Sequence, residues 1–469
     1  MQQVYLPRLS PKTHQTFAIE GMLSGRYANF DDQGLGKTKQ CYDVAAKLFE
    51  NGSIDLAIFV VKASLRETVL SETRSDAYQL HSIAVGGSKR SRFGIYNNLA
   101  HHVLVLSYET LVADQDVLRR LTSLNRTLLC FDESHYLKNF DSRRAQAALL
   151  LSELAVKTLT FSGTPIPNKM QDVFPQLKIL GFDVGSSKEE FLWRFPTEGD
   201  LKKFLKDKFI RRTKTELREL KIPKKFVRKI RVKLNPVERR MYDDLAGKVA
   251  TEFREKAEKT NSFSITHVLT RILRLHQIAS NAKLLDDKYN EPSSKLIVLD
   301  RLVESATKRG KKIIIWTTYR KNVAMLLERY KRHSAVSLHG GLNAQTRRRN
   351  ADEFKTNLNT KILVAIPACA REGFTLTSSH VAIYLDRSFS YLDWAQSQDR
   401  IHRISQTKKC EIIILEAENT IDERVDEIIK RKQQLQAYLL GEDTKYVPSI
   451  LTIEEVMGLI SPKGFSKHS

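Results

Sequence analysis

The sequence has little cysteine, and the cysteines it has form no pattern. Four occur in 469 residues, without a CxxC pair and without a histidine at zinc-ligand spacing beside them. This excludes a small disulfide-stapled scaffold and a cysteine-based zinc site. It predicts reduced, mostly buried thiols in a cytosolic protein. The four are Cys41, Cys130, Cys369 and Cys410.

Long hydrophobic runs are also missing. Runs such as LAIFVV at 56–61 are far shorter than the roughly 20 apolar residues that a transmembrane helix needs. The first twelve residues, MQQVYLPRLSPK, contain no apolar core of the signal-peptide type. We therefore expect a soluble, cytoplasmic protein with no membrane partner.

Acidic side chains are too few to balance the basic ones. Lys and Arg number 77 against 54 Asp and Glu, which leaves a net charge of +23. Such a surface attracts polyanions, so nucleic acid is the first candidate partner and a membrane surface the second. The length predicts two or three domains.

What the sequence does contain is a series of short, β-branched apolar runs separated by helical segments. The runs are continuous, as expected of strands that are covered on both faces, so the first part predicts a parallel α/β domain. Its runs are LAIFVV (56–61), HVLVLSY (102–108), TLLCF (127–131) and TLTFSG (158–163).

The pattern stops after Phe174, resumes near Lys311 and there predicts a second parallel α/β domain. The segment between is polar, helix-rich and basic, and residues 201–232 alone hold 14 Lys/Arg against 3 Asp/Glu. The second series is KIIIWTT (311–317), SAVSLHG (334–340), KILVAI (361–366), VAIYLD (381–386) and CEIIILE (410–416).

An amphipathic helix is predicted near the C-terminus, at TIDERVDEIIKRKQQLQAYLL (420–440). Thr420 and Glu423 have capping-box spacing. One face is apolar, so we expect the helix to pack on the second domain. That face holds Ile421, Val425, Ile428, Ile429 and Leu435.

The stretch FDDQGLGKTKQ (30–40) predicts a phosphate-binding loop between a strand and a helix. Gly34 and Gly36 would form the turn, Lys37 would reach the β- and γ-phosphate oxygens, and Thr38 would ligate Mg²⁺. The usual first Gly or Ala of such a loop is Asp31 here. The alternative is a Gly-rich turn with a solvated lysine.

The stretch CFDESHYLKN strengthens that prediction. It places Asp132 and Glu133 at the end of an apolar strand, where parallel sheets bind ligands. Asp132 would hold Mg²⁺ and Glu133 would deprotonate the attacking water. A surface acidic turn would explain this stretch alone, but it would not explain the two stretches together.

Five stretches together resemble the Snf family of superfamily-two helicase-like ATPases. They stand in that family's order and spacing, between about Leu6 and about Asp422. They are DDQGLGKT, DESHYLKN, SGTPIPN, FIRRTKTELRELKIPKK and QSQDRIHRISQ.

The resemblance implies an α/β fold with two RecA-like parallel-sheet domains in tandem and a basic helical insertion. We place the first domain at 1–200, the insertion at 201–292, the second domain at 293–445 and a tail at 446–469.

The resemblance also assigns site residues. Gln15 would read the adenine of ATP, while Ser162 and Thr164 would couple the nucleotide to DNA. Arg400 and Arg403, with Gln396 in register, would neutralise γ-phosphate charge in a site completed when the two domains close on ATP. A solvated basic helix face is the alternative for the arginines.

DNA contacts are expected in loops at strand ends and in the basic segment, where they would hold phosphates without reading bases. In the family the RRTK region braces the two domains against each other, so we expect Arg211 and Arg212 to serve the fold. The expected DNA-facing residues are Ser64, Ser107, Tyr108, Thr317, His339, Gly340, Thr375, Lys224, Lys225, Arg228 and Lys229.

The sequence thus predicts an ATP- and Mg²⁺-dependent DNA helicase or translocase, a monomeric motor acting on duplex, forked or branched DNA. Within the same chemistry, a protein-displacing remodeller or a restriction-type motor subunit is the alternative. A non-hydrolysing, ATP-gated clamp is a third reading, against which Glu133, Arg400 and Arg403 argue. The charge alone leaves RNA open as the substrate.

Overall fold

The computed structural model describes residues 10–25, 27–75, 80–98, 100–217, 220–259, 265–370 and 373–442. It divides into two compact units, one of residues 1–221 with 432–446, the other of residues 222–431 with 447–469. The division at residue 221 places residues 201–221 of the predicted insertion in the first unit and residues 222–292 in the second. The expected boundaries were at 200 and 292. The expected tail at 446–469 lies outside the described residues.

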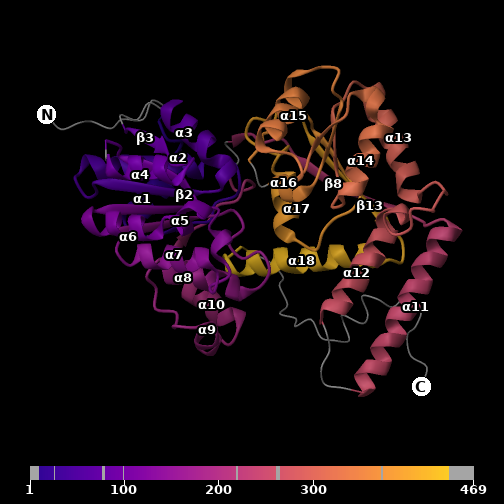
Figure 1. The fold of residues 1–469 in the computed structure, drawn as a ribbon, viewed down its shortest axis with the longest axis horizontal. Helices are drawn as coiled ribbons and strands as arrows, with labels where there is room; N and C mark the ends of the chain where they lie inside the picture. Colours follow the sequence, from indigo (N-terminus) through magenta and orange to yellow (C-terminus); the bar gives the residue numbers. More distant parts are fainter. Residues whose placement is uncertain are drawn as a thin grey trace. The chain divides into compact units, whose positions relative to one another are not determined.

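A seven-stranded parallel sheet forms the centre of the first unit (Figure 1). Its strand order is β3-β4-β2-β5-β6-β1-β7, and every pair is parallel. The strands are β1 (Ala28–Asn29), β2 (Leu56–Val61), β3 (Ser82–Ala84), β4 (Val103–Ser107), β5 (Thr127–Asp132), β6 (Lys157–Phe161) and β7 (Phe209–Ile210).

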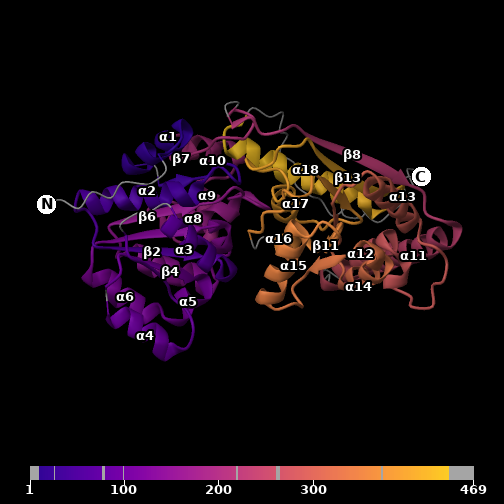
Figure 2. The same ribbon diagram turned by 90° about the horizontal axis from the view of Figure 1, so that it is seen from above.

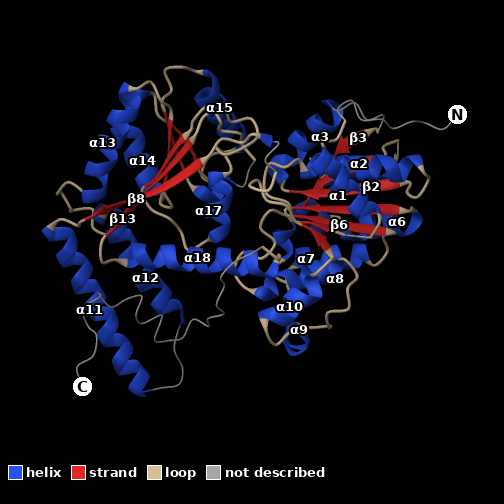
Figure 3. Ribbon diagram, turned by 180° about the vertical axis from the view of Figure 1, so that it is seen from behind, coloured by secondary structure: helices blue, strands red, loops and turns tan. Residues whose placement is uncertain are grey.

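Helices cover both faces of this sheet (Figure 3). In β2, Ala57 and Phe59 face the core beneath α1 and α2, while Ile58 and Val60 face the core beneath α5 to α7. This explains the continuous apolar run. The helices are α1 (Thr13–Leu23), α2 (Lys37–Glu50), α3 (Arg66–Ser75), α4 (Lys89–Asn97), α5 (Tyr108–Ala113), α6 (Gln115–Leu124), α7 (Arg143–Ser152), α8 (Phe174–Ile179), α9 (Lys188–Arg194) and α10 (Glu198–Leu205).

The second unit contains a six-stranded parallel sheet, in the order β10-β11-β9-β12-β13-β8. Strand β8 pairs along its whole length with β13 and is one of the two edge strands, β10 being the other (Figure 2). The strands are β8 (Lys225–Val232), β9 (Ile313–Trp316), β10 (Val336–Leu338), β11 (Ile362–Ala365), β12 (Val381–Tyr384) and β13 (Cys410–Ala417).

Two helices, α11 and α12, pack against each other in the part of the chain between β8 and the rest of this sheet. The second unit's helices are α11 (Pro236–Lys259), α12 (Ile265–Ser280), α13 (Ser294–Lys308), α14 (Arg320–Arg329), α15 (Ala344–Thr356), α16 (Pro367–Ala370), α17 (Tyr391–Gln398) and α18 (Ile421–Leu439).

The α/β class and the nine predicted strands are confirmed. The basic segment between the two series was expected to be helix-rich, and its strands β7 and the eight-residue β8 were not among those predicted. The reason is that side chains alternate between the two faces of a strand, and in KFVRKIRV the charged positions mask the apolar Phe226, Val227 and Ile230.

The C-terminal helix is confirmed as α18, but its capping differs from the expectation. The Oγ1 of Thr420 accepts from the backbone N of Asp422 at 3.3 Å, and Glu423 Oε1 accepts from the backbone N of Asn419 at 3.0 Å. Both bonds are displaced by one residue from a capping box. The described residues from Lys432 to Glu442 belong to the first unit, where Leu435 and Leu439 join an apolar core with Phe174.

Two predictions from absences can be compared with the structure. All four cysteines are buried and free of disulfide bonds, as expected. Within the described ranges, every helix is too short or too polar to cross a bilayer.

Candidate functional site

The predicted phosphate loop joins β1 to the start of α2. Gly34 and Gly36 have φ angles of 84° and 82°, in the left-handed region that favours glycine. A Cβ on Gly36 would lie only 2.3 Å from Gln15 Nε2. The backbone conformation therefore favours glycine at position 36, and a Cβ there would displace the amide of Gln15.

Lys37 is buried at the N-terminus of α2. Its Nζ donates to the carbonyl oxygens of Asp31 at 2.8 Å and Asp32 at 3.1 Å. Burial lowers the pKa of Lys37 below its usual value. Nearby carboxylates act in the opposite direction and raise that pKa, Glu133 most strongly. No side chain of the described residues caps this helix, so its first N–H groups suit an anion. The loop thus fits a phosphate group.

Asp132 ends β5, and Glu133 follows it with a left-handed φ of 51°. Gln33 Nε2 donates to Glu133 Oε1 at 2.8 Å, and His135 Nδ1 lies 3.2 Å from Glu133 Oε2. Burial alone would raise the pKa of Glu133, but His135, Lys37 and Gln33 outweigh it and lower that pKa to about 2. The Glu133 carboxylate is therefore ionised and held in place.

The same network reaches the SGTP stretch. His135 Nδ1 also lies 3.2 Å from Ser162 Oγ, which accepts from the backbone N of Thr164 at 3.1 Å. Sequence reasoning assigned no role to His135 or Gln33. Two features of the sequence could have indicated a role for them: Gln33 lies inside the phosphate loop, and His135 follows Glu133 by two residues.

Asp31, which departs from the usual loop pattern, forms a buried ion pair. Arg212 donates to both of its carboxylate oxygens and to the carbonyl of His14. Arg211 pairs with Asp32 at 2.9 Å and with Glu442 at 2.6 Å. The RRTK segment therefore fixes the phosphate loop from within the first unit.

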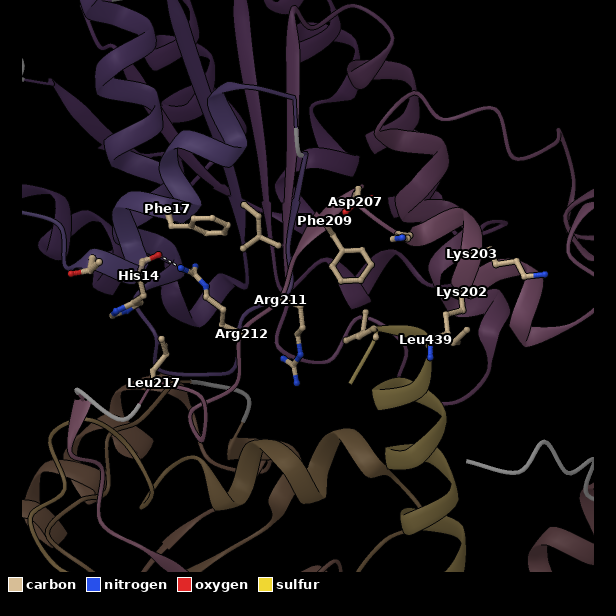
Figure 4. Close-up of a pocket in the computed structure, with 15 residues that line it drawn as sticks. His14, Phe17, Lys202, Lys203, Asp207, Phe209, Arg211, Arg212, Leu217 and Leu439 are labelled. Atoms are coloured by element: carbon tan, nitrogen blue, oxygen red, sulfur yellow. Dashed lines mark hydrogen bonds between the residues drawn. The ribbon is translucent and has the colours of Figure 1, made fainter. Parts of the chain in front are cut away.

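Gln15 lies beside this loop on α1. Its side chain is buried, accepts from the backbone N of Lys12 at 3.0 Å and donates to the carbonyl of Leu35. A cavity of about 890 Å³ opens next to it, between α1, β7, α10 and the end of α18 (Figure 4). Phe17 and Phe209 line that cavity, whereas Gln15 and Lys37 do not.

In the second unit, Arg400 and Arg403 lie in the turns after α17 and not on a helix. They still converge on one loop, because Arg400 Nη1 donates to the carbonyl of Phe374 and Arg403 Nη1 donates to Thr375 Oγ1 at 2.8 Å. Gln396 is fully buried on α17, and its carbonyl accepts from Arg400 Nε at 3.2 Å.

The expected DNA-facing side chains fall into two groups. Ser107, Tyr108 and Thr317 are buried within their units: Ser107 caps α5, Tyr108 donates to the carbonyl of Asp132, and Thr317 donates to Asp386. They cannot reach a strand in this conformation. His339, Gly340 and Thr375 are at least partly accessible, whereas Ser64 is partly accessible as a residue but its Oγ is buried.

The four basic residues of the expected DNA-facing segment do not act as one group. Lys225 donates to Gln398, and Lys229 pairs with Asp426 and Glu416. Arg228, on the opposite face of β8, pairs with Glu411 at 2.9 Å. Lys224 precedes the strand and is exposed.

No group of three or more His, Cys, Asp or Glu side chains in the described part of the chain could hold a metal ion. Mg²⁺ in nucleotide-hydrolysing sites commonly uses one or two carboxylates together with substrate phosphates and water. The single carboxylate of Asp132 beside the phosphate loop is compatible with that mode.

Comparison with protein-family models matches the SNF2-related domain over residues 14–284 and the helicase conserved C-terminal domain over residues 294–405. The chain belongs to the SNF2-related family. The first match covers the phosphate loop, the Asp132–Glu133 pair and the RRTK segment, and the second covers Gln396, Arg400 and Arg403.

Curated relatives of this SNF2-related chain include an uncharacterized ATP-dependent helicase of Mycoplasma pneumoniae, 26% identical over 453 residues that make up 94% of this chain and 43% of the relative. Another is the CHD3-type chromatin-remodeling factor CHR7 of Arabidopsis thaliana, 25% identical over 93% of this chain and 38% of the relative. The chain therefore spans less than half the length of these relatives.

Among solved structures, the SWI2/SNF2 ATPase core of Sulfolobus solfataricus in complex with dsDNA matches with a TM-score of 0.43 and 21% identity, covering 94% of this chain and 95% of that one.

Proposed function

We propose that this chain is an ATP-driven motor that moves along DNA. The observation that carries the proposal is that the phosphate loop and an ionised, immobilised Glu133 lie together in the first unit. Lys37 of this loop interacts electrostatically with the carboxylates of Asp132 and Glu133. Relatives named as ATP-dependent helicases support the same activity.

Each residue has a definite part in hydrolysis. Lys37 neutralises charge on the transferred phosphate, and Glu133 accepts the proton of the attacking water, which bonds to the γ-phosphorus as the bond to ADP breaks. Mg²⁺, held by Thr38 and Asp132, would neutralise phosphate charge. Gln15 would contact the adenine.

Arg400 and Arg403 supply two further positive charges for the transition state in this proposal. Their convergence on the loop at 374–375 supports a common role, because an Arg pair serving only solubility would not be anchored by two residues of one loop.

For the nucleic acid, we propose duplex or branched DNA bound through its backbone at Ser64, His339, Gly340 and Thr375. The net charge of +23 supports a polyanion. A protein-displacing remodeller is the second candidate, favoured by relatives named as chromatin-remodeling factors. A clamp without turnover would not need the ionised Glu133.

The decisive experiment measures ATP hydrolysis with single-stranded DNA, blunt duplex, a fork, a four-way junction and RNA side by side. We expect DNA to stimulate hydrolysis, with branched DNA the best activator. Lys37→Ala should abolish hydrolysis and leave DNA binding largely intact, because the loop is buried away from the exposed basic surface. Hydrolysis by Lys37→Ala at the wild-type rate would refute the assignment of the phosphate loop.

A further inference from the structure

A basic cavity of about 570 Å³ lies at the amino-terminal edge of the second unit's sheet. Lys311 comes two residues before β9, His380 directly before β12, and Lys408 and Lys409 directly before β13. Because these strands are adjacent and parallel, the residues that precede them gather at one edge.

This edge is opposite the one that holds two of the predicted DNA contacts, Thr317 and His339, whereas Arg228, another predicted contact, lines the cavity itself. Thr317 and His339 directly follow β9 and β10, at the carboxyl ends of the strands. A four-residue strand such as β9 spans roughly 13 Å. The cavity is therefore separate from the predicted DNA contacts at Thr317 and His339.

Cations in this cavity greatly outnumber carboxylates. Glu411 is the single carboxylate among the described lining residues, and Arg228 pairs with it at 2.9 Å. Lys311, Lys408 and Lys409 form no ion pair with any described residue. Burial, followed by the charges of Lys311 and Lys408, lowers the pKa of His380. The field is thus positive and suits an anion.

An aromatic side chain is exposed among these cations. Phe226 is 52% exposed and lies on the same face of β8 as Arg228, because side chains alternate along a strand. Lys225 and Lys229 lie on the other face, where they bond to Gln398 and Asp426. An exposed ring beside unpaired lysines is the arrangement with which proteins bind single strands of nucleic acid.

We propose that this cavity is an accessory site for an unpaired nucleic-acid strand. One base stacks on Phe226 while Lys311, Lys408 and Lys409 contact the adjoining phosphates. The inference rests on the proposed function in one respect, that DNA is the partner. It adds that the second unit holds a displaced or branched strand at the edge of its sheet opposite Thr317 and His339. An acidic peptide would satisfy the lysines but would leave Phe226 without a role.

The test measures fluorescence anisotropy of fluorescein-labelled oligothymidylate with the nucleotide-free full chain. Phe226→Ala should weaken binding by roughly 5- to 100-fold, the effect of losing one base stack, and Phe226→Trp should retain it. The double variant Lys408→Ala/Lys409→Ala should lower the log–log salt slope by about 0.7 for each phosphate that is no longer neutralised. Blunt duplex should bind Phe226→Ala as tightly as wild type.

Matched controls lie on the same unit. Val227→Ala removes a 47%-exposed side chain from the opposite face of β8, and Lys283→Ala/Lys288→Ala removes two exposed lysines outside the cavity. Both should bind like wild type. Thermal unfolding checks that each variant is folded.

Equal affinities of Phe226→Ala and Val227→Ala for the single strand would overturn the proposal. The proposal would also be overturned if polyglutamate competed with the oligonucleotide and Phe226→Ala weakened polyglutamate binding as much as oligonucleotide binding. The site would then take an acidic peptide. If the wild-type chain bound no DNA of any kind, the proposed function itself would fail. If the wild-type chain bound DNA but Phe226→Ala bound the single strand equally well, this inference would be overturned and the proposed function would stand.

Discussion

Asp426 shows how one buried carboxylate can hold several cations in the second unit. Lys229, Arg387 and Lys430 all pair with it, at distances of 2.5 to 3.0 Å. Burial alone would raise the pKa of Asp426, but these cations, Lys229 first, lower it to about 2. Lys229, which the sequence suggested for DNA, is therefore used to join β8 to α18.

The lowered pKa predicts a pH-dependent contribution to stability. A carboxyl whose pKa falls on folding stabilises the native state above its unfolded value, near 3.8, and loses that effect as the pH falls through about 2. Allowing for solvent screening, Asp426→Asn should lower the free energy of unfolding by about 1–2 kcal/mol at pH 7, and by about half of that at pH 3.

Urea unfolding at pH 7 and at pH 3 measures this difference. Asp287→Asn, whose carboxylate is 82% exposed and pairs only with an exposed lysine, is the control and should change little at either pH. An Asp426→Asn deficit of the same size at both pH values would show that the ion pairs are not its cause.

The phosphate loop illustrates the scale of elements, because its geometry depends on a segment 181 residues away. Arg212 follows β7, and β7 pairs with β1 directly before the loop. Strand pairing thus carries Arg212 to Asp31 and Arg211 to Asp32. Asp31, which replaces the usual small residue of the loop, and the neighbouring Asp32 therefore bond to the two arginines that follow the edge strand β7.

A double-mutant cycle on Asp31 and Arg212 should show strong coupling. Removing one partner leaves the other charge buried and unpaired, which costs about 3–5 kcal/mol, so each single variant should unfold at a much lower urea concentration. Asp31→Asn/Arg212→Met should recover part of the loss.

The exposed pair Arg126–Asp55 provides the comparison, since its side chains are 55% and 45% exposed. Coupling there should be close to experimental error. Additive effects of the Asp31 and Arg212 variants would mean that the pair does not hold the loop.

At the scale of the whole molecule, the excess of positive charge is divided between internal pairs and accessible surface. Residues 201–232 hold 14 basic side chains, yet Arg211, Arg212, Lys225 and Lys229 are bonded to groups of their own unit. The part of the charge that remains accessible, and not the total, determines how DNA affinity responds to salt.

This division predicts different outcomes for two pairs of substitutions. Lys224→Ala/Arg228→Ala should flatten the log–log salt dependence of duplex binding by roughly one unit for each phosphate that is no longer neutralised, with little change in stability. Lys225→Ala/Lys229→Ala should flatten the slope less, because Lys229 is already paired with Asp426 and Glu416, and should lower the unfolding temperature. Titrations over a range of salt concentrations, together with thermal unfolding, measure both. A larger change of slope for Lys225→Ala/Lys229→Ala than for Lys224→Ala/Arg228→Ala would contradict this division of the basic residues.

The sequence by itself determined the α/β class, nine strands and the residues of the phosphate loop, because these depend on local patterns. A continuous apolar run such as LAIFVV predicts a strand wherever it lies in the chain, and GLGKT carries its conformational requirement in its own glycines. The helix at 421–439 was equally local, apart from the exact bonds at its first turn.

Tertiary structure alone decided which partners the basic residues of β8 have, although Lys225, Arg228 and Lys229 are all exposed. Lys225, Arg228 and Lys229 look alike in sequence, but the alternation of β8 sends Lys225 and Lys229 toward Gln398 and Asp426, and Arg228 toward the cavity of Phe226. The pairing of Asp31 with Arg212 likewise follows from the neighbouring positions of β1 and β7. A charge's partner is set by which distant segments meet in space, and no local pattern encodes that meeting.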